Sequence, residues 1–309
     1  MLRFFLTRVA TAIPTLFVII ALSFFLMRLA PGGPFDSART LDPSIAENLR
    51  HIYKLDRPLL EQFFYYLRSL ADGDLGPSLH WRDFTVNELF ATALPISVTL
   101  GAKAMLTAIL AGTALGLFGA MSKGWMGQRL IDGASIVGIA VPVFVVAPLL
   151  QLGFGLALHV LPVGGWDDGA WQNQVLPVAT LALPQIAIIA RLMQAALNDT
   201  LGKPHMRTLR AFGMPAYHIY IHALRAALPP VVSYLGLAAA NVLTGSVIVE
   251  TIFGIPGMGR YFVYGALGRD YTLVMGTVIV VAAAVLLFNL IVDLVLAWLD
   301  PRVRYEAGL

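Results

Sequence analysis

The chain has 309 residues, of which 58% are hydrophobic and only 13% are charged, against about 25% charged residues in typical soluble domains. This is the composition of an integral membrane protein. Because the sequence contains no cysteine, disulfides, thiolate metal sites and cysteine nucleophiles are excluded. The net charge of +3 is small and no run of Lys or Arg occurs, so nothing indicates nucleic-acid binding.

The first predicted membrane span is the uncharged run at residues 9–27, within an N-terminal segment 1–30. Its length of about 19 residues is enough to cross a hydrocarbon layer roughly 30 Å thick. Arg3 and Arg8 precede the run, which is also a feature of secretory signal peptides. Because the run exceeds the usual apolar stretch of a signal peptide, about 7–15 residues, and no A-x-A cleavage site follows, we predict an uncleaved span.

Residues 31–94 are predicted to form an extracytoplasmic helical insertion between the first and second spans, because acidic residues are frequent there. Asp42-Pro43 and Asp56-Arg57-Pro58 are typical of helix starts, and Ala71-Asp72-Gly73 is typical of a helix end. The helix between the last two signals has a broad apolar face. This face packs either on the outer mouth of the spans or in the lipid headgroup layer. It consists of Leu59, Leu60, Phe63, Phe64, Leu67 and Leu70.

Residues 95–309 are predicted to form a core of five further spans, which makes the chain an all-α integral membrane protein with six. Prolines and glycines are frequent in these spans, Pro142 and Pro184 among them. Such helices either belong to moving or cavity-lining bundles or reflect the general frequency of Gly and Pro in membrane helices. The five predicted spans are residues 95–120, 134–158, 175–197, 231–252 and 272–299.

A polar loop at residues 203–230 separates the fourth and fifth spans and is predicted to form two short helices around a corner. Gly213 can adopt the left-handed conformation that ends a helix, and Pro215 suits the first turn of the next one. Such a bent amphipathic pair either lies on the lipid surface or docks a cytoplasmic partner. The first helix has Met206, Leu209 and Phe212 on one stripe and Arg207 and Arg210 on another, and the second has His218, His222 and Arg225 on one stripe.

The distribution of Lys and Arg predicts that both termini are cytoplasmic. In this orientation the outer side carries only Arg28, Arg260 and Arg269. Segment 31–94 is set aside, because loops beyond about 60 residues cross the membrane largely regardless of charge. The 203–230 loop is then in the cytoplasm. The basic residues at the inner boundary are Arg3, Arg8, Lys123, Arg129, Arg191, Lys203, Arg207, Arg210, Arg225, Arg302 and Arg304.

The stretch ETIFGIPGMGRYFVYGALGRDYTLV lies between the fifth and sixth predicted spans. Its glycines and proline predict a tight corner, and its aromatic residues suit the headgroup layer. We treat it as a candidate structural or gating loop. The residues concerned are Gly254, Pro256, Gly257, Gly259, Arg269 and Asp270.

Polar side chains within the spans form a further set of candidates. Asp293 in the last span is a functional candidate by default, because ionisable groups are costly in a membrane. Helix pairing or snorkelling near the inner boundary explains it equally well. On the fifth span the candidates are Asn241, Thr244, Ser246 and Glu250, which either line a translocation path or make interhelical hydrogen bonds.

Several of these motifs resemble one family. RTLRAFG followed by HALRAALPPVVSYLG is similar to the cytoplasmic loop, typically R-T-A-R-A-K-G, of permease subunits in bacterial ABC importers of the peptide and nickel class. Leu209 and Phe212 stand where that family usually has alanine and lysine, and Arg207 replaces the acidic residue of the wider signature. The 250–271 stretch resembles the family pattern E-T-[IV]-[FY]-x-[IL]-P-G-[IM]-G with A-[LI]-x-R-D-Y. Three further segments are similar to sequences of this family: the opening residues of the chain, the segment GDLGPSLHW, and the closing segment FNLIVDLVLAWLDPRVRY. The resemblance is closest to the B-type subunit of oligopeptide permeases.

The resemblance implies a type I ABC importer permease fold in the bacterial cytoplasmic membrane. It further implies a homologous C-type permease as partner, two cytoplasmic ATPase subunits that hold ATP and Mg, and an extracytoplasmic peptide-binding protein. The chain itself is expected to bind no cofactor. In the family, the cytoplasmic loop fits a groove of the ATPase subunit. The residues that this implies for ATPase coupling are Arg207, Thr208, Arg210, Ala211, Gly213, Pro215, His222 and Arg225.

Catalytic and nucleotide-binding motifs are missing from the sequence, so we expect no enzymatic activity. There is no G-x-x-x-x-G-K-[ST] phosphate loop, G-x-S-x-G or H-E-x-x-H motif. His218 and His222 lack an intervening glutamate and a third ligand, so they indicate a polar stripe rather than a zinc site. Asp167 and Asp168 indicate a solvated loop. The alternatives are a related importer of dipeptides, nickel or antimicrobial peptides, an ion-driven secondary transporter, or an intramembrane enzyme.

Overall fold

A computed structural model describes residues 2–29, 47, 51, 54–81, 83–122 and 125–299. Within these ranges the regular elements are helical, as predicted. The predicted helix start at Asp42-Pro43, and the basic residues Lys123, Arg302 and Arg304 used for the orientation, lie outside the described residues.

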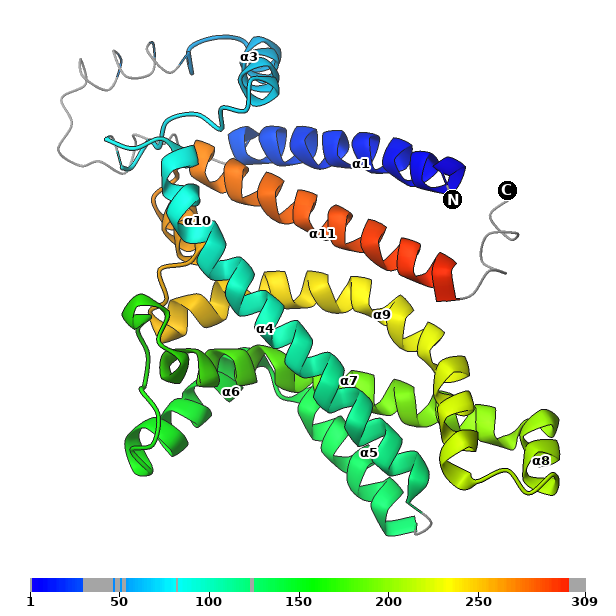
Figure 1. The fold of residues 1–309 in the computed structure, drawn as a ribbon. Helices are drawn as coiled ribbons and strands as arrows, with labels where there is room; N and C mark the ends of the chain where they lie inside the picture. Colours follow the sequence, from blue (N-terminus) through cyan, green and yellow to red (C-terminus); the bar gives the residue numbers. More distant parts are fainter. Residues whose placement is uncertain are drawn as a thin grey trace. The chain divides into compact units, whose positions relative to one another are not determined.

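The chain order of the helices is drawn in Figure 1. A π-helix (Gln151–Ala157) continues α6 directly, and a short 3₁₀ turn (Asp167–Gly169) precedes α7. The helices are α1 (Leu2–Leu29), α3 (Leu59–Ala71), α4 (Val86–Met121), α5 (Trp125–Ala140), α6 (Val143–Leu150), α7 (Trp171–Gly202), α8 (Pro204–Ala211), α9 (Ala216–Phe253), α10 (Met258–Leu267) and α11 (Tyr271–Leu299).

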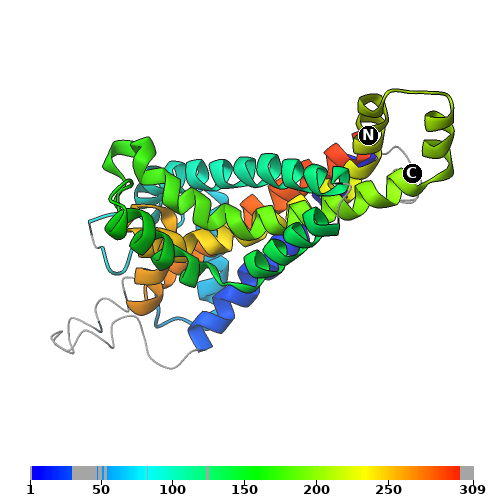
Figure 2. The ribbon, with the colours of Figure 1, turned by 90° about the horizontal axis from the view of Figure 1, so that it is seen from below.

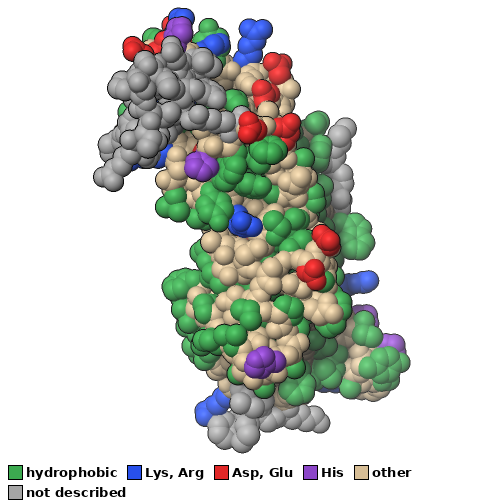
Figure 3. Space-filling view, turned by 90° about the vertical axis from the view of Figure 1, so that its left-hand side faces the viewer, with side chains coloured by type: hydrophobic (Ala, Val, Ile, Leu, Met, Phe, Trp, Pro, Cys, Tyr) green, Lys and Arg blue, Asp and Glu red, His purple; other side chains and the backbone are tan. Residues whose placement is uncertain are grey.

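Five helices in the described part of the chain are long and apolar enough to cross a membrane: α1, α4, α7, α9 and α11. Many of their large hydrophobic side chains are exposed. Figure 3 shows hydrophobic side chains spread over one face of the molecule. A sixth crossing requires α5 and α6 with its π extension, which are bent by 102° relative to each other. The prediction of one continuous helix over 134–158 is therefore wrong. Pro142 has no N–H and disfavours helical geometry at Val141, so the helix ends there.

The prediction of a separate second short helix in the polar loop is also wrong. Instead of a short helix followed by a span from 231, α9 is one helix from Ala216 to Phe253. Pro229 and Pro230 lie inside it without ending it. Consecutive prolines remove two backbone donors, which bends a helix rather than stopping it when the flanking turns are well packed. Figure 1 shows α9 curving along its course.

The chain divides into two compact units, and the first comprises Met1–Arg8, Val98–Ile255 and Val285–Leu309. In it α7 packs along α9, and α5 packs along α7. Gly112 and Gly116 bring α4 against α7. An added Cβ at Gly116 would lie 2.5 Å from the Ala190 carbonyl oxygen, and one at Gly112 would lie 2.8 Å from the Ile189 side chain. Small residues four apart permit this close helix approach in membranes.

The second unit comprises Val9–Ser97 and Pro256–Ala284, and it contains two apolar clusters. One joins the start of α4 to α10 and α11 through Val86, Phe90, Met258 and Leu273. The other joins α1, α3 and α11, with Ile20, Phe24, Phe63, Met275 and Ile279 buried at its centre.

Candidate functional site

The polar loop forms a corner between α8 and α9, fixed by a backbone turn at Gly213. Gly213 has φ +72°, the left-handed conformation predicted for it. The Gly213 N–H donates to the Arg210 carbonyl at 3.0 Å, and the Met214 N–H donates to the Leu209 carbonyl at 3.2 Å. Together these are the two hydrogen bonds of a Schellman motif. Pro215 then caps the start of α9 in an extended conformation.

The corner is also tied to the end of α7. An Nη2 of Arg210 donates to the Leu201 carbonyl at 3.3 Å, and the Lys203 ammonium lies 3.2 Å from the Asp199 carboxylate. Met206 is buried beneath α8. Figure 2 shows α8 and the start of α9 side by side, joined by the turn. A pocket of about 270 Å³ remains under the corner, lined by Leu201, Arg210, Met214, Ala216, Ile219 and Tyr220.

The outward surface of the corner combines apolar and cationic side chains. Phe212 is 83% exposed, Tyr217 62% and Ile221 60%. Large exposed apolar side chains on a polar loop are typical of surfaces that contact a partner or a membrane. The predicted coupling residues that are exposed around them are Arg207, Thr208, Arg210, Ala211, Gly213, Pro215, His222 and Arg225.

The four polar candidates on α9 do not share one face. Asn241 and Thr244 are exposed, whereas Ser246 and Glu250 are buried. The Thr244 hydroxyl donates to Ala240 O at 2.8 Å and the Ser246 hydroxyl donates to Leu243 O at 2.8 Å, both within α9. Of the four candidates, Asn241 and Thr244 are thus the exposed ones, and their place on a translocation path stays a prediction.

Side-chain hydrogen bonds between spans occur at residues that the sequence analysis did not select. The Tyr234 hydroxyl of α9 donates to Gln185 Oε1 of α7 at 2.6 Å. Lys103 of α4 donates to Gln174 Oε1 of α7. Side chains from different helices meet here because of helix packing, which periodicity within one helix does not reveal.

The first part of the predicted gating loop ends α9. Gly254 has φ +65° and caps the helix, and the Ile255 N–H donates to the Glu250 carbonyl at 2.8 Å. The Phe253 carbonyl accepts from the Gly165 N–H at 2.7 Å. An added Cβ at Gly164 would lie 2.5 Å from that carbonyl oxygen, so the loop before α7 lies directly against the end of α9.

The second part of the gating loop is organised by Asp270, which is fully buried. Its Oδ2 accepts from the Ser78 hydroxyl at 2.5 Å and from the Leu79 and His80 N–H groups at 2.9 and 3.0 Å. Its Oδ1 accepts from the Leu273 N–H at 3.1 Å and caps α11. Asp270 therefore joins α11 to the chain before α4, a contact 192 residues apart in sequence.

The other residues of this loop lie at the two ends of α10. Gly257 caps α10, and the Met258 N–H donates to the Ser97 hydroxyl at 2.8 Å. Gly259 is buried, whereas Pro256 and Arg269 are exposed, and Arg269 has φ +56°. These contacts fit a structural role, and whether the loop also gates the pathway stays a prediction.

Asp293 pairs with Arg8 at the start of α1, with Oδ2 and Nε 3.1 Å apart. This contact supports the helix-pairing interpretation of Asp293. Among the described residues, no group of three or more His, Cys, Asp or Glu side chains is arranged to hold a metal ion. His218 and His222 are both exposed on α9, and Asp167 and Asp168 are exposed in the 3₁₀ turn.

Several long apolar helices, two of them joined through a polar corner, are the features of a multi-pass membrane protein. The family model described as binding-protein-dependent transport system inner membrane component matches residues 112–305, and the model of its N-terminal part matches residues 1–84. The chain belongs to this family of multi-pass inner membrane components.

Individual relatives are similar over nearly the whole chain. It is 45% identical over 306 residues to the oligopeptide transport system permease protein OppB of Escherichia coli K12, covering 99% of this chain and 100% of that protein. It is 36% identical over 305 residues to the dipeptide transport system permease protein DppB of Bacillus subtilis 168, covering 98% of each.

A solved crystal structure of an amino acid ABC transporter with histidines is similar in fold. The TM-score is 0.51 at 20% identity, covering 70% of this chain and 94% of that one. Together with the family match, this confirms the predicted all-α ABC importer permease fold.

Proposed function

We propose that the chain is the permease subunit of an ATP-driven ABC importer that carries oligopeptides across the cytoplasmic membrane. The observation that carries this proposal is the corner at Gly213. It is fixed by its own hydrogen bonds, exposes Phe212, Tyr217 and Ile221, and continues without a break into the span α9. Force applied to such a corner is transmitted to the span.

The partners in this proposal are a homologous C-type permease, two cytoplasmic ATPase subunits and an extracytoplasmic peptide-binding protein. ATP and Mg are held by the ATPase subunits, with both termini of this chain on the same cytoplasmic side. Closure of the ATPase pair moves the corner, and this movement opens the spans outward to receive peptide. ATP hydrolysis then returns the spans to their starting state. The permease contributes conformational change and no bond-making residue.

Uptake by the assembled transporter in proteoliposomes tests this function. With ATP supplied to the ATPase side, the binding protein on the opposite side and no ion gradient, labelled tri- to pentapeptides should accumulate. Accumulation that follows a proton or sodium gradient and ignores ATP would instead identify a secondary transporter.

Dipeptides are the second candidate substrate, since the B. subtilis relative is a dipeptide permease. Its identity to this chain, 36%, is lower than the 45% of the oligopeptide relative, which favours longer peptides. Competition of labelled tetrapeptide uptake by unlabelled dipeptide separates the two. Complete competition at equal concentration would favour the dipeptide assignment.

A further inference from the structure

Helix α3 packs against the side of α1, and Phe63 is the most enclosed aromatic side chain of this contact. Phe63 is only 6% exposed. Its ring centroid lies 5.1 Å from that of Phe24, 5.2 Å from that of Phe25 and 6.1 Å from that of Phe17. These contacts place Phe63 alongside residues 17–25 of α1, within the apolar part of a candidate membrane span.

The depth of this contact can be measured from the end of the span. Arg28 lies in the last turn of α1, where its Nε donates to Gln62 Oε1 of α3 at 2.9 Å and its guanidinium lies 3.6 Å from the Phe24 ring centroid. At 1.5 Å per residue, Phe25 and Phe17 lie about 4.5 and 16 Å from Arg28 along the axis. The Phe63 ring therefore lies about one to three turns from Arg28 into the apolar run of α1.

The same level is indicated by α11. Phe63 shares its cluster with Met275 and Ile279, which lie one and two turns into that helix. Figure 1 shows α3 running across the direction of α1, as a helix lying in the plane of a membrane does.

The exposed side of α3 carries an apolar stripe separate from its packed face. Leu60 is 64% exposed and Phe64 66%, and their i, i+4 spacing puts them on one line. Ala71 continues this line two turns on. The next line around the helix carries Glu61 and Arg68, both exposed. Around its circumference, α3 is thus apolar on two neighbouring surfaces, the face packed on α1 and the exposed stripe. The rest of its circumference is polar, which is the pattern of an interfacial helix.

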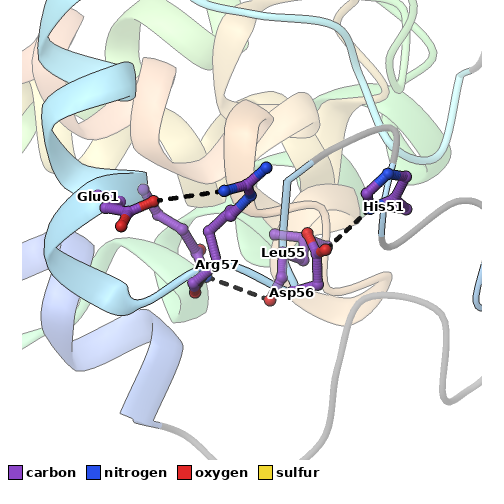
Figure 4. A network of polar contacts seen from close by, with 6 residues as sticks. His51, Leu55, Asp56, Arg57 and Glu61 are labelled. Carbon is purple, nitrogen blue, oxygen red and sulfur yellow. Dashed lines mark hydrogen bonds and ion pairs between the residues drawn. The ribbon is translucent and has the colours of Figure 1, made fainter.

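The chain before α3 is polar, as a segment on the water side should be. His51 Nδ1 lies 2.8 Å from Asp56 Oδ2, and Arg57 lies 3.9 Å from Glu61 (Figure 4). The hydrogen bond from His51 lowers the pKa of the Asp56 carboxyl, which therefore stays charged. The Lys54 ammonium lies 3.8 Å from the Tyr65 ring centroid. Several charged groups placed together need hydration, so the side of α3 that carries them must face water.

We propose that α3 is an interfacial helix immersed in the membrane leaflet at the Leu29 end of α1, with Leu60 and Phe64 in contact with lipid acyl chains. On α1 itself, Leu22, Leu26 and Leu29 are also exposed, as expected of a span in contact with lipid. The insertion thus anchors itself in the bilayer. This inference depends on α1 being a span and is independent of the transported substrate.

Spin labels at single cysteines test the proposal in the assembled transporter reconstituted in liposomes. The chain has no cysteine, so Phe64→Cys and Leu60→Cys need no other change, and a transporter with the unaltered chain is the blank. Oxygen concentrates in the bilayer, whereas a water-soluble nickel chelate is excluded from it. The ratio of oxygen to nickel accessibility should be several-fold higher at positions 60 and 64 than in the matched variants Glu61→Cys and Arg68→Cys.

Two results would overturn the lipid contact. Nickel accessibility at position 64 equal to that at position 61 would place the stripe in water. Low accessibility to both reagents at positions 60 and 64 would show that a protein, either the second permease or the binding protein, covers it. Leu60→Cys provides the same readout if Phe64→Cys fails to assemble.

Discussion

Two amphipathic helices that lie outside the spans, α3 and α8, are held in place by different means. α3 is held by side-chain packing, with Phe63 enclosed by three rings of α1. α8 is only eight residues long and has a single buried side chain, Met206. Its position depends on the turn at Gly213 and on hydrogen bonds to backbone carbonyls.

This difference matches the work that we propose for each helix. A helix anchored by aromatic packing and lipid stays with its span, which suits a fixed insertion. A helix anchored through backbone geometry leaves its own side chains unpacked, so Phe212 is free to enter a partner. In these proposals the two exposed aromatic residues have different roles, since Phe64 contacts lipid and Phe212 contacts a partner protein.

Phe63→Ala should produce the largest effect, because it removes the ring on which the packing of α3 depends. Large-to-small substitutions of buried Phe cost about 3–5 kcal/mol. Opening of α3 should then rise by more than about a hundredfold, at 1.4 kcal/mol per factor of ten. Trypsin cleavage after Arg68, measured on the transporter in liposomes, reports this opening.

Phe64→Ala is the matched control, since it removes the same ring from an exposed position. It should raise the cleavage rate far less than Phe63→Ala. Equal rates in the two variants would mean that packing on α1 does not hold α3, and the contrast with α8 would be lost.

Gly213→Val should uncouple the transporter, because the corner depends on a left-handed residue. A side chain in that conformation costs about 1–2 kcal/mol, and a β-branched one is worse. An added Cβ at Gly213 meets no atom within 4 Å, so the cost comes from the backbone and not from a clash. We expect ATP hydrolysis to continue while peptide uptake in proteoliposomes falls to near background.

Gly213→Asn distinguishes the effect of the left-handed backbone conformation from the effect of adding a side chain. Asn tolerates the left-handed conformation better than other residues with a Cβ, so this variant should keep most of the uptake. Normal uptake by Gly213→Val would contradict the role of the corner, and equal loss in both variants would show that any added side chain blocks a partner there.

Local signals predicted the ends of helices well in both regions. Ala71-Asp72-Gly73 ends α3 at Ala71 with Gly73 at φ +77°, and Gly213 turns as expected. Each of these outcomes is decided by a residue's own backbone preferences. Proline was a less reliable signal, because its effect on a helix depends on the surrounding packing. Pro142 breaks a helix, whereas Pro229 and Pro230 lie within one.

Contacts between distant parts of the chain were not predictable from one sequence. Asp270 was selected from a motif, but its hydrogen bond to Ser78 spans 192 residues and follows only from the packing of α11 against the chain before α4. The apolar face expected on α3 was assigned as one surface. The structure divides it into a packed part containing Phe63 and an exposed part containing Leu60 and Phe64, a division that depends on where α1 lies.

Arg207→Glu should have a smaller effect, confined to docking of the ATPase subunit. No described residue forms an ion pair with Arg207, whereas the Arg210 guanidinium is bonded to the Leu201 carbonyl. Reversing an exposed charge at a partner surface costs about 0.2–1 kcal/mol per pair, so pull-down affinity should fall by up to about fivefold. The loss should shrink at high salt, because exposed charges are screened.

Arg210→Glu should weaken docking and also loosen the corner, so uptake should fall more than affinity. Arg207→Lys keeps the charge and should bind as the unaltered chain does. If Arg207→Glu and Arg207→Lys bind equally well at moderate salt, the cationic side chain at 207 has no part in docking. The exposed apolar group of Phe212, Tyr217 and Ile221 would then have to supply the contact alone.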